Sequence, residues 1–146
     1  MQSAKSAGFL RVLSISPIEE DHLSLGAIVR HSRWMMFKAD HLVGALGFLR
    51  QHDISVILCE RDLAPGKWTD ILEYANDLSH PPSLIVTSRQ ADERLWAEAL
   101  NLGAWDVLAK PFDRTEVLRS VTAAWQHWYG QMQAPGRATN QLRAAS

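Results

Sequence analysis

Polar side chains end three short apolar segments of this sequence, and their types suggest that they could act together. Lys110 and Pro111 follow one segment, Thr87 and Ser88 end another, and Glu60 ends a third. If the segments are parallel strands, their carboxyl ends meet at one edge of a sheet, where open α/β sheets bind ligands. A lysine at such an edge can direct its ammonium at an anion. These residues are therefore the first candidate site.

Strand-like and helix-like segments alternate along the chain and would position this site. The predicted strands are residues 11–16, 34–39, 55–59, 84–86 and 107–109, and each is followed by apolar residues at helical spacing. Asp40 and Asp113 are expected helix N-caps, and Gly103 is an expected C-terminal cap. Five such units joined by right-handed crossovers predict one parallel sheet with helices on both faces.

The domain organisation follows from composition. We expect a flexible N-terminus at residues 1–8, one domain at 9–130 and a polar tail at 131–146. The formal net charge of -1 gives no reason to expect nucleic acid or anionic membrane as a partner. Cys59 is the single cysteine, and the N-terminus has no apolar signal segment, so we expect a cytoplasmic protein.

Residues 9–129 resemble the receiver domain of two-component response regulators. The matching segments are Val12-Leu13-Ser14-Ile15, Val56-Ile57-Leu58-Cys59-Glu60, Leu63-Ala64-Pro65-Gly66, Thr87-Ser88-Arg89 and the segment from Leu102 to Phe112. The resemblance implies a CheY-like, doubly wound, five-stranded parallel sheet in the order 2-1-3-4-5 with five helices. It also implies a cis peptide bond at Lys110–Pro111 and a signalling module, not an enzyme.

An active receiver uses two acids after the first strand to hold Mg²⁺ and an aspartate after the third strand to accept a phosphoryl group. This sequence has Ser16 and Pro17 where the two acids are expected, and neither holds a hard cation as a carboxylate would. Glu60 stands at the acceptor position and is expected to pair with Lys110. The departures predict a degenerate receiver that needs no cofactor and signals without phosphorylation.

Two alternatives stay open at this point. In the first, Asp62 or Glu60 accepts a phosphoryl group and Glu19 or Glu20 holds Mg²⁺, although acids at 19–21 are ordinarily favourable charges at a helix N-terminus. In the second, the fold is a flavodoxin-like small-molecule binder. It is disfavoured because the loop at 16–18 lacks the small residues of a phosphate cradle. Thr87 and Ser88 compete for the position of the pocket hydroxyl.

Four of the six tryptophans lie between residues 96 and 128, and this suggests how the domain would act. The aromatic residues concerned are Trp96, Trp105, Trp125 and Trp128. We expect them to mark an interaction face on the fourth helix, fifth strand and fifth helix, because aromatic clusters are typical of binding hot spots. The expected partner is a protein, such as a histidine kinase, an output protein or a second copy. The six histidines show no metal-ligand spacing and are expected in surface or loop positions.

Overall fold

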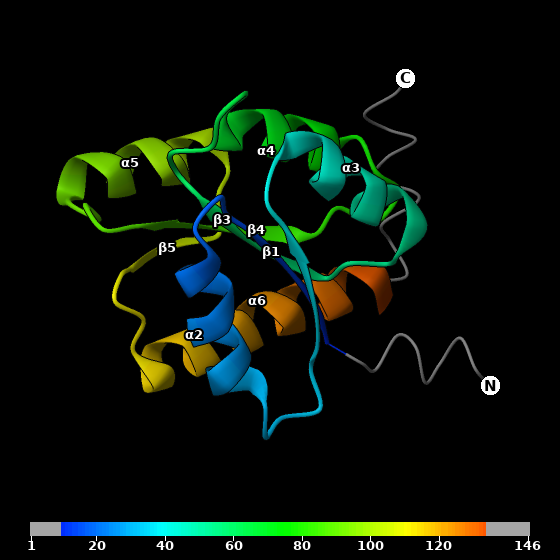
Figure 1. Cartoon of the computed structure of the whole chain (residues 1–146). Helices are drawn as coiled ribbons and strands as arrows, with labels where there is room; N and C mark the ends of the chain where they lie inside the picture. The colour runs from blue at the N-terminus through cyan, green and yellow to red at the C-terminus, as the bar shows by residue number, and fades with distance from the viewer. Residues whose placement is uncertain (1–9, 134–146) are drawn as a thin grey trace.

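The computed structural model describes residues 10–133 (Figure 1). Its strands are β1 (Arg11–Ile15), β2 (Met35–Ala39), β3 (Val56–Glu60), β4 (Ser83–Ser88) and β5 (Asp106–Ala109). Its helices are α2 (Glu19–Val29), α3 (Leu42–Gln51), α4 (Trp68–Asn76), α5 (Glu93–Leu102) and α6 (Arg114–Gln133). The predicted N-terminal segment lies outside the described residues. Most of the predicted tail does too, but α6 continues through residues 131–133.

All five strands are parallel and lie in the order β2-β1-β3-β4-β5. This order confirms the predicted fold class. β3 occupies the centre and is buried along its whole length, which explains why its sequence is a nearly continuous apolar run. Because every strand runs the same way, the residues that follow β1, β3, β4 and β5 are brought to one edge of the sheet.

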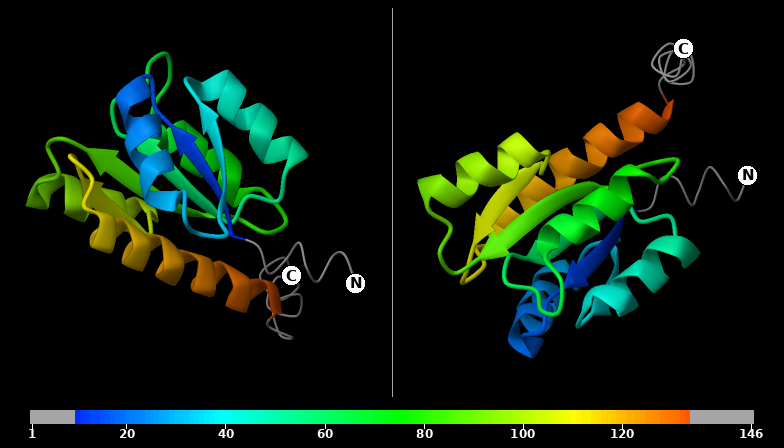
Figure 2. Two further views of the ribbon diagram at one scale, coloured as in Figure 1. Left: turned by 60° about the horizontal axis from the view of Figure 1, so that its bottom comes forward. Right: turned by 90° about the horizontal axis from the view of Figure 1, so that it is seen from above.

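Helices cover both faces of the sheet, with α3, α4 and α5 on one side and α2 and α6 on the other (Figures 1 and 2). Side chains alternate between the two cores along each strand. Leu13 and Ile57 belong to the core under α3, α4 and α5, whereas Val12 and Leu58 pack with α2 and α6. The alternation fixes which strand residues can reach the elements on each face.

Local signals for helix ends were mostly informative. Asp113 accepts a hydrogen bond from the backbone N–H of Glu116 at 2.9 Å, and Gly103 ends α5 with φ 111°, both as expected. The expectation for Asp40 was wrong, because α3 is capped one residue later. The ring of His41 accepts a hydrogen bond from the backbone N–H of Gly44. The imidazole ring takes the place of the usual Asp, Asn, Ser or Thr side chain at the N-cap. The preference for those residues favoured Asp40 in the prediction.

Two peptide bonds before proline are cis in the described part of the chain. One is Lys110–Pro111, as predicted, and the other is Ala64–Pro65. No helix within residues 10–133 is both long enough and apolar enough to cross a membrane.

Candidate functional site

Lys110 occupies the centre of the polar edge of the sheet. It follows β5 directly, and its side chain is only 3% exposed. Its ammonium donates to Asp21 Oδ2 and to Glu60 Oε1. These contacts join three elements that are far apart in the sequence, namely the first turn of α2, the end of β3 and the end of β5. The expected pairing of Lys110 with Glu60 is present, and Asp21 is an additional partner.

Asp21 reaches the site because it lies on the buried face of α2. It is four residues before Leu25, which is 1% exposed, so the two share one side of the helix. The hydroxyl of Ser16 donates to Asp21 Oδ2 at 2.6 Å and accepts from the backbone N–H of Ile18 at 3.0 Å. Ser16 is therefore part of the site as an orienting hydroxyl for the carboxylate.

The neighbouring acids of α2 do not enter the site. Glu19 and Glu20 are exposed, and Glu19 pairs with Lys38 at 3.2 Å on the surface. The preference of helix N-termini for acids applies equally to all three residues and does not distinguish Asp21 from its neighbours. The signal that identifies it is the spacing from Asp21 to Leu25 and Ile28, which places a carboxylate in the apolar stripe.

Glu60 ends β3 and is 4% exposed. One carboxylate oxygen contacts Lys110, and the other accepts the backbone N–H of Asp62. The side chain of Asp62 is 75% exposed and pairs with Arg61 at 3.3 Å. Of the two acceptor positions considered from sequence, only Glu60 is therefore inside the site, and Asp62 lies in the loop outside it.

Cys59 shows what burial does to an ionisable group beside this site. It precedes Glu60 on β3, and its side chain is packed in the core under α3, α4 and α5. Burial raises the pKa of the Cys59 thiol well above its usual range. The charge of Glu60 adds to the effect, and that of Lys110 opposes it. Cys59 is thus a packing residue with a protonated sulfur and no nucleophilic thiolate.

Thr87 and Ser88 end β4 and are both buried. Thr87 is the register partner of Glu60, and the hydroxyl of Ser88 accepts the backbone N–H of Gln90 at 3.0 Å. Ser88 therefore caps the loop after β4. It also lines a cavity of about 250 Å³ with Glu60, Asp62 and Arg89, which opens beside the site.

His22 corrects the expectation that the histidines lie at the surface or in loops. It is 2% exposed and lies under the site. Its Nε2 donates to the carbonyl of Ser16 at 2.9 Å, its Nδ1 lies 2.9 Å from the hydroxyl of Ser14, and Asp40 Oδ1 is 3.5 Å from Nε2. These contacts fix the loop after β1 and so hold Ser16 against Asp21.

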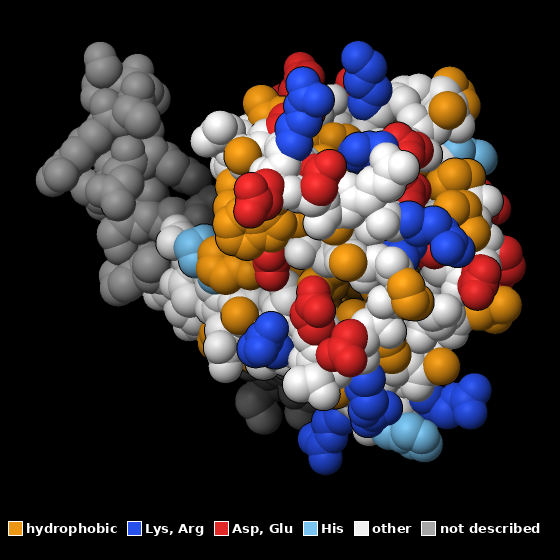
Figure 3. Space-filling model, turned by 90° about the vertical axis from the view of Figure 1, so that its left-hand side faces the viewer, with side chains coloured by type: hydrophobic (Ala, Val, Ile, Leu, Met, Phe, Trp, Pro, Cys, Tyr) orange, Lys and Arg blue, Asp and Glu red, His pale blue; other side chains and the backbone are white. Residues whose placement is uncertain are grey.

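The tryptophans divide between surface and core. Trp96 is 47% exposed on α5 and Trp105 is 37% exposed before β5, whereas Trp128 is 3% exposed. Figure 3 views the molecule from the side of α5 and β5 and shows hydrophobic side chains gathered there with acidic side chains beside them. The exposed members of the predicted interaction face are therefore Trp96 and Trp105.

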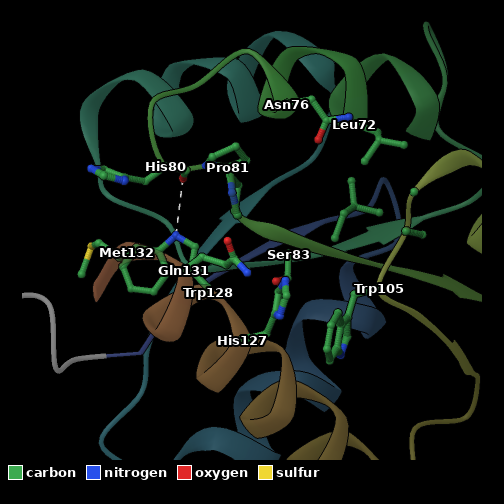
Figure 4. A pocket seen from close by; sticks show the side chains of 14 residues that line it. Leu72, Asn76, His80, Pro81, Ser83, Trp105, His127, Trp128, Gln131 and Met132 are labelled. Atoms are coloured by element: carbon green, nitrogen blue, oxygen red, sulfur yellow. Dashed lines mark hydrogen bonds between the residues drawn. The ribbon is translucent and has the colours of Figure 1, made fainter. Parts of the chain in front are cut away.

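Trp128 and Trp105 border a pocket of about 250 Å³ at the end of the sheet opposite Lys110 (Figure 4). Trp128 donates through Nε1 to the carbonyl of His80 at 3.4 Å. Trp105 stacks on His127, with ring centroids 4.8 Å apart. Trp125 is partly buried and stacks on Tyr129 at 5.2 Å. Trp125 and Trp128 thus serve mainly the packing of α6.

Comparison with known proteins identifies the family. The family model of the response regulator receiver domain matches residues 20–122. The chain belongs to this family. A receiver domain of a putative LuxO repressor protein from Vibrio parahaemolyticus is similar in fold, with a TM-score of 0.75 at 20% identity over 82% of this chain and 92% of that chain. The chemotaxis response regulator CheY4 of Vibrio cholerae gives a TM-score of 0.71 at 14% identity, covering 80% and 98% of the two chains.

Two further relatives bear on the comparison. The beryllofluoride-activated NtrC4 receiver domain dimer has a TM-score of 0.74 and 22% identity, covering 81% of this chain and 98% of that chain. The two-component response regulator-like APRR1 of Arabidopsis thaliana is 38% identical over 77 residues. That match spans 51% of this chain but only 12% of the plant protein.

The Mg²⁺ implied by the receiver family does not fit the residues of this receiver domain. Within residues 10–133, no group of three or more His, Cys, Asp and Glu side chains could hold a metal ion. Both buried carboxylates already contact Lys110, and Asp21 also accepts from Ser16. Pro17 is exposed and carries no ligand atom on its side chain. The charged side chains of the site therefore neutralise one another in an internal ion-pair network.

Proposed function

We propose that this receiver domain is a signalling module that binds a protein partner without depending on phosphorylation. The observation that carries the proposal is the contact of Lys110 with both Asp21 and Glu60. In phosphoryl transfer, catalysis is mostly positioning and neutralisation of negative charge. Here the lysine is already engaged by two carboxylates, and a glutamate stands at the acceptor position.

The interaction face proposed for partner binding comprises Trp96, Leu102 and Trp105. These side chains are 47%, 50% and 37% exposed on α5 and before β5. Exposed aromatic residues supply large contact areas at protein interfaces. The partner is a protein of the two-component system, such as a histidine kinase or an output protein, or a second copy of the chain. A reducing cytoplasm would suit the free, buried thiol of Cys59.

Phosphorylation dependence is tested with acetyl phosphate, and separately with beryllofluoride, each in the presence of Mg²⁺. Tryptophan fluorescence reports the response. We expect no saturable, Mg²⁺-dependent change. A saturable change would favour the alternative, a working phospho-acceptor, and the variants Glu60→Gln and Asp62→Asn would then show which carboxylate accepts.

The interaction face is tested by sedimentation of the wild type and of the double variant Trp96→Ala/Trp105→Ala over a range of concentrations. If the face supports a homodimer, the double variant sediments as a monomer where the wild type associates. Val43→Ala is a matched control, because Val43 is 74% exposed on α3 and lies away from this face. If the wild type and both variants associate equally, the proposed interaction face is contradicted.

A further inference from the structure

The polar edge of the sheet needs a cation. The side chains of Asp21 and Glu60 are 8% and 5% exposed, so two carboxylates are held away from water. Buried carboxylates without a partner are strongly destabilising, and they are retained only when a positive charge or hydrogen bonds compensate them. The positive charge that the structure places there is the ammonium of Lys110.

Three of the four carboxylate oxygens of Asp21 and Glu60 already accept hydrogen bonds. Asp21 Oδ2 accepts from Lys110 and from Ser16, Glu60 Oε1 accepts from Lys110, and Glu60 Oε2 accepts from the backbone of Asp62. A hard divalent cation requires about six oxygen ligands. The two oxygens that contact Lys110, Asp21 Oδ2 and Glu60 Oε1, could contribute to such a set only if they released the ammonium.

We infer that Lys110 is the built-in cation of this site and takes the place of a divalent metal ion. Asp21 makes this arrangement possible, because it brings a second carboxylate from α2 to an ammonium that would otherwise face Glu60 alone. The inference rests on the proposed function, in which partner binding does not depend on phosphorylation. It goes further by stating what excludes the metal.

A specific consequence separates this inference from a simple loss of metal ligands. If the ligands were merely lost, removing the lysine charge would leave the site unable to bind a metal. If the lysine takes the place of the metal ion, Lys110→Met leaves two carboxylates without a cation, and a divalent ion can then bridge them. Mn²⁺ is a suitable probe, because it prefers carboxylate oxygens and is seen directly by electron paramagnetic resonance.

The experiment titrates Mn²⁺ into the wild type, Lys110→Met, Lys110→Arg and the double variant Asp21→Asn/Lys110→Met. We expect the methionine variant to bind one Mn²⁺ at least about tenfold more tightly than the wild type, and its Tm to rise with Mn²⁺. The arginine variant keeps the charge and should bind no more than the wild type. The double variant lacks one carboxylate and should lose the gained affinity.

Lys38→Met is the matched control. Lys38 pairs with Glu19 from the same helix, but both side chains are 58% exposed. Removing its charge frees a carboxylate at the surface, where water already solvates it. We expect no gain in Mn²⁺ affinity, and this arm also tests Glu19 as a metal ligand.

Equal Mn²⁺ affinity of the wild type and Lys110→Met would overturn the inference. If Lys110→Met fails to fold alone, recovery of the folded state by millimolar Mn²⁺ supports it. Absence of that recovery, together with no Mn²⁺ binding by the milder variant Lys110→Gln, overturns it. Beryllofluoride binding by the wild type is a separate result that overturns the proposed function. Mn²⁺ binding by the wild type without a beryllofluoride response overturns only the present inference.

Discussion

Helix α2 contributes acids to two ion pairs that differ mainly in their exposure to water. Glu19 meets Lys38 at the surface, where both side chains are 58% exposed. Two residues further along, Asp21 meets Lys110 in a site where the side chains are 8% and 3% exposed. The first pair is solvated with or without its partner. In the second pair, each buried charge is compensated by the other. Only the second pair can therefore determine how α2 packs against the end of β5.

The largest expected effect comes from Lys110→Met. The substitution leaves Asp21 and Glu60 buried without their cation, and we expect the free energy of unfolding to fall by roughly 3–5 kcal/mol. Urea unfolding at neutral pH and low divalent-ion concentration measures the loss. A loss as small as that of a surface pair would mean that the two ion pairs do not differ as described.

An alkaline pH series sharpens the contrast by showing what burial does to an ionisable group for which it is the dominant effect. The pKa of the buried Cys59 thiol is raised from its ordinary value of 9.0. Below that value the thiol is protonated whether the chain is folded or unfolded, so it causes no pH dependence. Above it only the unfolded chain ionises, and stability falls by about 1.4 kcal/mol per pH unit.

The measurement for this prediction compares urea unfolding of the wild type with that of Cys59→Ala from neutral to alkaline pH. The variant loses packing at every pH, but the pH-dependent loss from the thiol should be missing. Parallel curves for the two chains would show that the thiol ionises equally in both states.

Asp21→Asn should have an intermediate effect. It removes one carboxylate but leaves Glu60 paired with Lys110, and the amide oxygen can still accept from Ser16. We expect a loss of about 1 kcal/mol, the size of one altered hydrogen bond. The same urea measurement applies. A loss equal to that of Lys110→Met would show that the pairing of Lys110 with Asp21, and not its pairing with Glu60, contributes most of the stability of the network.

Lys38→Met should have the smallest effect. Exposed pairs of this kind contribute below about 1 kcal/mol, and added salt weakens them further. Unfolding in low and high salt should therefore give nearly the same curves for the variant and the wild type. A clear destabilisation would show that the surface pair anchors α2 to β2.

The fold was more predictable than the site, and particular residues show why. Strand positions follow from apolar runs such as Val56 to Cys59, which the centre of a parallel sheet requires. Asp21 was misjudged because a charge rule was applied to residues 19–21 as a group, and His22 because the histidines were judged by metal-ligand spacing alone. The rule for helix N-termini describes the charge of a turn, but the face on which each side chain lies decides its partner. Reading Asp21 against Leu25 supplies that information.

The partners of Lys110 lie 89 and 50 residues away along the chain. During synthesis, α2 and β3 are made before Lys110. The chain therefore carries both carboxylates before it carries the cation that pairs with them. A nascent chain that ends before β5 holds both carboxylates but lacks the ammonium that neutralises them, so burying them would be strongly unfavourable. The residue that follows the last strand therefore completes the charge balance of α2 and β3, and the ion-pair network of this edge requires the chain to extend past β5.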